Sequence, residues 1–156
     1  MNIIYKNVIS VDDINAIRKS MGWRQDNPEQ LQSSIIGSTL IVAAYDNEKV
    51  IGVARLIWDG GGSANIAGVL VTPEYCNLGI EEKIIEEILD YLRKQLKPGY
   101  GIQVDIRAFG YQESLYENIG FTLSTIERRG IPMHICLTNQ IELTDKMFGQ
   151  MGYVKD

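Results

Sequence analysis

One stretch in the middle of the chain constrains the fold more than any other, because an apolar strand runs into a long amphipathic helix. The strand spans residues 64–71, and from Gly79 apolar residues recur at helical spacing with charged residues on the opposite face. The charged face is acidic at its start and basic at its end, as the helix dipole favours. Lys97, Pro98 and Gly99 end the helix, and residues 102–108 alternate like a strand. This order predicts a crossover between two parallel strands.

The chain before this crossover predicts a strand, two helices and an antiparallel meander. Ser10 and Asn27 are suited to cap helix N-termini, and Gly22 ends the first of the two helices. Polar residues 46–49 and the glycine-rich residues 59–63 are typical of hairpin connections. The glycine run lacks the lysine of a phosphate loop and the helix that would follow it. The expected elements are strands at 2–8, 39–45, 50–58 and 64–71, with helices at 11–21 and 28–35.

The segment after the crossover predicts a short helix at 112–118 and a closing pair of strands at 121–127 and 132–137. Antiparallel hairpins and one helical crossover together indicate an α/β or α+β fold with a mixed sheet. A length of 156 residues is most naturally one domain. We expect that domain to span 1–138. The tail at 139–156 is expected to pack on it or on the second subunit of a homodimer.

The composition excludes several classes of partner. Fifteen Lys and Arg residues against twenty Asp and Glu residues give a net charge of −5. This balance argues against nucleic acid and anionic membranes, which both favour a basic surface. Two cysteines and a single histidine are too few for a zinc site within one chain or for a disulfide framework. No signal peptide or long apolar run is present, so we expect a cytoplasmic protein without a bound metal.

The junction at residues 69–80 is the best candidate for a binding site. A buried strand ends at Pro73, a short polar loop follows, and Gly79 opens the strong helix. Such a junction exposes backbone amides at a helix N-terminus, where phosphate groups bind readily. The alternative is a simple strand-to-helix turn that binds no ligand.

Two segments carry a resemblance to a known family. Residues 71–75 read Val-Thr-Pro-Glu-Tyr, and Gly79-Ile80 opens the helix. This run is similar to the coenzyme A motif of the GNAT superfamily of acetyltransferases. Residues 115–121 read Leu-Tyr-Glu-Asn-Ile-Gly-Phe, which is similar to a second motif of that family. The order of elements agrees with the family from Tyr5 to about Leu137. The resemblance implies a mixed, twisted sheet with helices on both faces.

The resemblance also implies a reaction and its residues. Acetyl-CoA would place its diphosphate on the backbone of the loop and helix start, and an amide near Leu70 or Val71 would polarise the thioester oxygen. An amine would attack directly, without an acyl-enzyme. Tyr116 would protonate the departing thiolate, the alternative being a core tyrosine. The residues assigned to the co-substrate are Leu70, Val71, Cys76, Asn77, Leu78, Gly79, Ile80, Glu81 and Glu82.

The chain departs from the family pattern at three positions. Cys76 stands where the family usually has Gln or Arg, which removes a side-chain partner for the diphosphate. Glu81 stands where Gly or Ala usually lets the backbone approach the phosphates. A carboxylate about 4–6 Å from a diphosphate would cost about 1–4 kcal/mol, less if it points outward. Gly68 occupies a strand position that is an acid in many relatives. A carboxylate there could orient the amine or act as base, and glycine can do neither.

The remaining candidates concern the acceptor and the base. Trp23 and Arg24 lie where GNAT relatives line the acceptor side, and an exposed pair could hold a carboxylate or a ring. The alternative places Trp23 in the core. His134 is expected to be a sheet residue with its hydrogen bonds satisfied. Asp59 and Glu74 are the acids nearest the expected cleft, but neither is assigned as base. Cys76 as a nucleophile is disfavoured, because the family chemistry needs none.

The resulting expectation is N-acetyl transfer from acetyl-CoA to a primary amine of a small molecule or peptide. The acidic composition favours a cationic acceptor. One alternative is a GNAT-fold protein that has lost transfer activity and serves as a binding or regulatory module. Another is a GNAT domain that uses a different acyl donor, since pocket shape sets acyl length.

Overall fold

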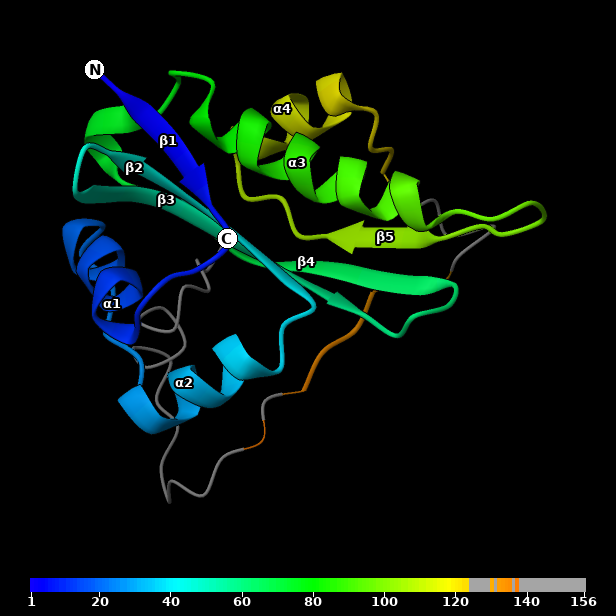
Figure 1. Ribbon diagram of the computed structural model, residues 1–156, viewed down its shortest axis with the longest axis horizontal. Helices are drawn as coiled ribbons and strands as arrows, with labels where there is room; N and C mark the ends of the chain where they lie inside the picture. Colours follow the sequence, from blue (N-terminus) through cyan, green and yellow to red (C-terminus); the bar gives the residue numbers. More distant parts are fainter. Residues whose placement is uncertain (124–129, 131, 136, 138–156) are drawn as a thin grey trace. The chain divides into compact units, whose positions relative to one another are not determined.

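The computed structural model describes residues 1–123, 130, 132–135 and 137. The chain divides into two compact units, Met1–Arg107 and Ala108–Asp156. The first unit contains a mixed sheet and three α-helices, and the second contains α4 (Gln112–Ile119) (Figure 1). The strands are β1 (Ile3–Lys6), β2 (Leu40–Asp46), β3 (Lys49–Trp58), β4 (Ser63–Val71) and β5 (Gln103–Ile106). The helices of the first unit are α1 (Val11–Ser20), α2 (Pro28–Ile36) and α3 (Ile80–Gln95), with a 3-10 turn η1 at Pro73–Tyr75.

The sheet follows chain order, β1-β2-β3-β4-β5. Strands β1 to β4 pair antiparallel, and β5 pairs parallel to β4 from Ser63↔Gln103 to Ile66↔Ile106. Parallel neighbours need a crossover connection, and α3 supplies it. The predicted crossover and the predicted hairpin loop at 59–63 are both confirmed.

Helices cover both faces of the sheet, so β2 and β3 are buried almost throughout (Figure 1). On one face α1 and α2 enclose an apolar cluster that includes Ile17, Val53 and Leu70. On the other face α3 packs against β2, β3 and β4 through a stripe that includes the fully buried Ile84 and Ile88. Removing such side chains from water is worth about 1.5–3 kcal/mol each. Apolar residues at helical spacing on α1 and α3 therefore account for both cores.

A bulge interrupts the pairing of β3 and β4. Val53 pairs with Leu70 but Arg55 pairs with Ala67, so two residues of β4 oppose one residue of β3. The first of the two is Gly68, with φ +60°. A glycine in the left-handed region is the usual first residue of one bulge type, because a Cβ is strained there. A backbone requirement therefore explains Gly68, where the family resemblance suggests an acid.

Several expected boundaries differ from the structure. Strand β1 is shorter than residues 2–8, and its ladder with β2 ends at Lys6↔Ala43. The described residues of the expected closing pair, 121–123, 132–135 and 137, are not in strands. The rest of that pair and the tail at 139–156 lie outside the described residues, so the division at 138 stays a prediction. Within the described ranges, no helix combines the length and apolar character needed to span a bilayer.

Candidate active site

The C-terminal half of β4 forms one side of the candidate site. The ladder to β5 ends at Ile66↔Ile106, whereas β4 continues to Val71. The amide of Thr72 donates to the Ile51 carbonyl (2.8 Å), and Gly52↔Val71 is the next pair. Hydrogen-bonded and non-hydrogen-bonded pairs alternate in an antiparallel ladder, so the Val71 amide points away from β3. Of the two amides named from sequence, Val71 is directed to the edge where β5 has ended. Leu70 is directed toward β3.

The loop after β4 turns the chain through two left-handed residues before α3 starts. Cys76 is extended, at φ −61° and ψ 146°. Asn77 has φ +63° and Gly79 has φ +76°. Asn and Gly are the residues that tolerate this region best. Asn77 and Gly79 therefore allow the chain to turn sharply from the loop into α3.

The first turn of α3 presents its backbone amides without a side-chain cap. Its N-cap residue is Gly79, which has no side chain to accept a hydrogen bond. The bond from the Lys83 amide to the Gly79 carbonyl (3.1 Å) is the start of the helical series. The amides of residues 80–82 consequently have no intrahelical acceptor, and the helix dipole adds positive potential there. This arrangement suits a diphosphate.

Glu81 lies on the buried side of this first turn. Its side chain is 6% exposed, and at helical spacing it shares a face with Ile84, Ile85 and Ile88. The carboxyl group therefore does not extend into bulk water, as it would on the outer face of α3.

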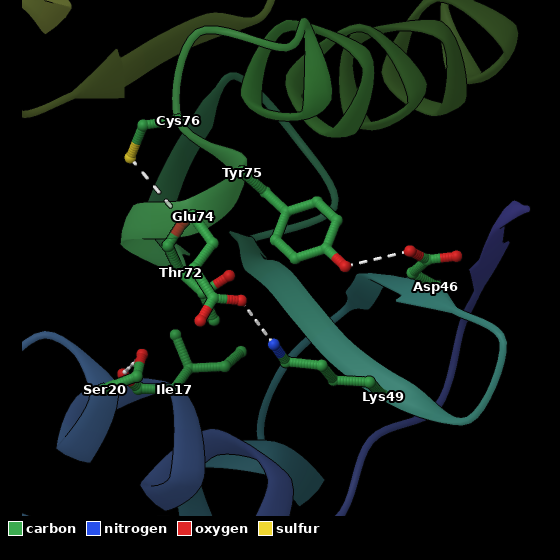
Figure 2. A network of polar contacts seen from close by, with 8 residues as sticks. All are labelled: Ile17, Ser20, Asp46, Lys49, Thr72, Glu74, Tyr75 and Cys76. Atoms are coloured by element: carbon green, nitrogen blue, oxygen red, sulfur yellow. Dashed lines mark hydrogen bonds and ion pairs between the residues drawn. The ribbon is translucent and has the colours of Figure 1, made fainter. Parts of the chain in front are cut away.

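Figure 2 shows how the loop is fixed to the hairpin of β2 and β3. The Tyr75 hydroxyl donates to Asp46 Oδ2 (2.9 Å), which raises the pKa of Tyr75. Two hydrogen bonds lower the pKa of Asp46. The larger effect comes from the backbone amide of Asn2, and the next from the Tyr75 hydroxyl. Lys49 Nζ lies 2.6 Å from Glu74 Oε2, and this hydrogen bond raises the lysine pKa. Glu74, one of the two acids near the expected cleft, thus pairs with an exposed lysine.

Cys76 and Thr72 lie at the base of this loop. The Cys76 thiol donates to the Thr72 carbonyl (3.7 Å), a contact that anchors the turn (Figure 2). Thr72 has the same parity as Leu70 along β4 and therefore faces the α1 side of the sheet. Its side chain is buried, and its Oγ1 has no hydrogen-bond partner within the described part of the chain.

Replacing Thr72 by valine is expected to raise stability by about 1 kcal/mol, because a buried unsatisfied hydroxyl is penalised and valine has the same shape. The gain should shift the melting temperature upward by about 2–4 °C in thermal unfolding. Thr39→Val is the matched control. Thr39 Oγ1 accepts from the Trp58 amide (3.0 Å), so its loss should destabilise the chain. A loss of stability in Thr72→Val would show that the hydroxyl has a bound partner.

The connection between α1 and α2 carries the two residues predicted to face the acceptor. Arg18 fixes this connection: its Nε donates to the Arg24 carbonyl (2.8 Å) and its Nη2 lies 3.2 Å from Asp26 Oδ1. Trp23 is half-buried, packs against the apolar cluster and lies 5.7 Å from the Arg18 guanidinium. The side chain of Arg24 is exposed. The acceptor-binding role of this pair stays a prediction.

The second unit holds Tyr116 on α4. Its side chain is 2% exposed, and its ring centroid lies 6.0 Å from that of Phe121. The Phe121 amide donates to the Tyr116 carbonyl (3.0 Å), which closes the helix end at Gly120. The acid role of Tyr116 stays a prediction. His134 is exposed and lies outside any strand, unlike the sheet position expected for it.

Sequence reasoning missed one charged residue of this region. Arg55 lies in the middle of β3, flanked by apolar residues on both sides. A charged residue within a buried strand is itself a signal, since such residues are rarely buried without a partner. Among the described residues, no three His, Cys, Asp or Glu side chains form a group that could hold a metal.

Comparisons with known proteins agree with this geometry. The model of the acetyltransferase (GNAT) domain family matches residues 15–138. The N-acetyltransferase ycf52 of Pyropia yezoensis, itself described as uncharacterised, is 24% identical over 90 residues. That match covers 55% of this chain and 52% of the relative, so the chain spans about half its length.

Solved structures of other proteins share the fold. A probable acetyltransferase from meticillin-resistant Staphylococcus aureus has a TM-score of 0.75 and 22% identity, covering 87% of this chain and 100% of its own. A GNAT-family acetyltransferase from Streptococcus pneumoniae has a TM-score of 0.67 and 22% identity, covering 89% and 98%. Together with the uncapped start of α3 and the Val71 amide at the edge of β4, the family match leads to one conclusion. The chain belongs to the GNAT acetyltransferase family.

Proposed function

We propose that this chain transfers an acetyl group from acetyl-CoA to a primary amine of a small molecule or peptide. The observation that carries the proposal is the uncapped first turn of α3 beside the outward amide of Val71. The backbone of residues 76–82 would bind the diphosphate through amides and helix dipole, without metal. The Val71 amide would hold the thioester oxygen and stabilise the negative charge that develops there.

The chemistry needs only one proton donor from the protein. The amine nitrogen attacks the acetyl carbon, an amide bond forms, the carbon–sulfur bond breaks, and coenzyme A leaves as the thiolate. Tyr116 would protonate that thiolate, and the attacking nitrogen loses one proton to solvent or to a base as the neutral amide forms. A phenol with a pKa of about 10 can serve a thiolate with a pKa of about 8.5 in a dry site. No base is assigned.

The proposal extends to the setting of the enzyme. Two cysteines provide no disulfide framework, which is typical of a reducing compartment such as the cytoplasm. We propose a catalytic domain at 1–138 and a tail at 139–156 that packs on it or on a second subunit of a homodimer.

A second function is favoured by the loop itself. Glu81 is buried in the first turn of α3, and the Cys76 thiol donates its hydrogen bond to the Thr72 carbonyl. Both features weaken an anion site relative to the family pattern. A GNAT-fold protein that no longer transfers acetyl groups, and instead binds or regulates another molecule, is the alternative.

Titration calorimetry with coenzyme A and acetyl-CoA separates the two functions. We expect a dissociation constant in the micromolar range or tighter, about −8 kcal/mol. Pantetheine, which lacks the diphosphate, should bind at least tenfold more weakly because it cannot use the amides of α3. The absence of heat and of a thermal shift at millimolar coenzyme A would reject the transferase and favour the binding module.

A further inference from the structure

Arg55 is a half-buried cation whose hydrogen bonds to the described residues go only to neutral groups. Its Nη1 donates to the Ser34 carbonyl (3.2 Å) and to Ser38 Oγ (3.0 Å). These contacts place the guanidinium beside the last turn of α2, on the face of the sheet that α1 and α2 cover. Burial lowers the pKa of Arg55 and the charge of Asp26 partly opposes this. Asp26 itself pairs with Arg18 at 3.2 Å.

The opposite edge of the guanidinium faces the bulge of β4. A Cβ added to Gly68 would lie 3.5 Å from Arg55 Nε and 3.8 Å from Nη2. Glycine supplies no such atom, so this edge is not covered by a side chain of residue 68. In the described part of the chain, no acceptor bonds to Nε or Nη2 and no carboxylate forms an ion pair with Arg55. The Nε–Nη2 edge is a fork that binds a carboxylate with two parallel hydrogen bonds.

A half-buried cation is costly unless an anion pairs with it, and the described residues place no carboxylate on this edge. Resting on the proposed function, we propose that Arg55 binds an anionic group, a carboxylate by preference, carried by the amine acceptor. Gly68 lies three positions before Val71, and a strand advances about 3.3 Å per residue, so the two sites are about 10 Å apart. That span suits an acceptor of the length of an amino acid or a dipeptide.

This inference refines the expectation drawn from net charge. An overall charge of −5 favours a cationic acceptor, but the charge beside the bulge is positive. Arg18 and Arg55 share one nearby acid, Asp26, and Arg24 is exposed on the same connection. The acceptor is therefore zwitterionic: its amine reacts at Val71 and its anionic group is held at Arg55.

A purely structural role for Arg55 makes a different prediction. Its bond to the Ser34 carbonyl stabilises the C-terminal turn of α2, as cations near helix ends do. That role uses Nη1 alone. With that role alone, added anions would not bind at the Nε–Nη2 edge. Acceptor selectivity would also stay unchanged when arginine is replaced by lysine.

The first test follows the Arg55 Nε–Hε cross peak of the full chain by arginine-selective NMR. We expect a saturable shift with sodium acetate, and inorganic phosphate serves as a second probe. A response to phosphate alone would reassign the anionic group as a phosphate and retain the zwitterionic acceptor. A cross peak that neither anion moves up to about 100 mM would overturn the proposal.

The second test uses kinetics with paired acceptors, an amino acid or dipeptide and its C-terminal amide. Arg55→Lys should raise KM for the acid at least tenfold and leave KM for the amide unchanged, because lysine keeps the charge but loses the fork. Arg93→Lys is the matched control, since Arg93 is exposed and pairs with Asp90 on α3. Equal KM changes for acid and amide would assign Arg55 a structural role.

The two proposals fail separately. Calorimetric affinity for coenzyme A should be unchanged in Arg55→Lys. If coenzyme A does not bind the wild-type chain at all, the transferase proposal fails while the anion titration still reports on Arg55. If the lysine variant does not fold, judged by circular dichroism, the wild-type titration decides alone.

Discussion

Replacing Tyr116 by phenylalanine is expected to lower kcat about a hundredfold while the dissociation constant for coenzyme A stays nearly constant. The physical reason is that the hydroxyl would give its proton to the departing thiolate, so its loss removes an interaction of the transition state. The phenylalanine ring retains the apolar volume that packs at 6.0 Å from Phe121. Steady-state kinetics and calorimetry on the same preparations measure the two quantities.

Tyr100→Phe serves as the control for this experiment, because Tyr100 is 54% exposed and lies outside the candidate site. Its kcat should equal that of the wild-type chain. A Tyr116→Phe variant whose affinity falls as much as its rate would remove Tyr116 from the acid role. Melting curves of both variants establish that the comparison is made between folded chains.

Replacing Glu81 by glutamine is expected to tighten coenzyme A binding about tenfold, equivalent to about 1.4 kcal/mol. Glu81 is buried in the turn whose amides would hold the diphosphate, and repulsion across about 4–6 Å ranges from about 1 kcal/mol in bulk water to about 4 kcal/mol at an effective dielectric constant near 20. Glutamine keeps the shape and removes the charge. Calorimetric titration at low and high salt measures the change.

Two companion variants separate charge from backbone access. Glu86→Gln removes an equal charge from an exposed position of α3 and should leave the affinity unchanged within twofold. Glu81→Gly also removes the Cβ, so any gain beyond that of Glu81→Gln measures the steric part. Unchanged affinity in Glu81→Gln would show that the carboxyl group is turned away from the anion.

The local sequence pattern was sufficient to predict the elements that have a strong hydrophobic periodicity or an N-cap residue. Ser10 and Asn27 accept hydrogen bonds from Asp13 and Gln30 as N-caps should. The apolar stripe of α3 predicted most of its buried face, although Glu81 is buried as well and Leu96 is exposed. These features depend on residues within one or two turns of each other, so the sequence holds all the information they need. The closing strands were harder to predict, because a strand forms only where a distant segment supplies its hydrogen bonds.

The candidate site likewise combines features that the sequence predicted with features that only the structure shows. The loop at 76–79 was located from its glycine and its place between strand and helix, and the family resemblance supplied its chemistry. The sequence did not distinguish Val71 from Leu70, because that choice depends on which amide pairs with β3. It also gave no sign that Arg55 would lie against Gly68, since that contact crosses from β3 to a bulge in β4.

The sequence by itself determined the order of the elements, the crossover and the position of a helix start that suits anions. These features depend on periodicity and on caps, which act over short distances along the chain. Tertiary structure alone decided the burial of Glu81, the direction of the Val71 amide and the uncovered edge of Arg55. Each of these depends on the register between strands or on the face that a helix turns to the sheet. Pairing and packing between distant segments set both, and neither is written in local composition.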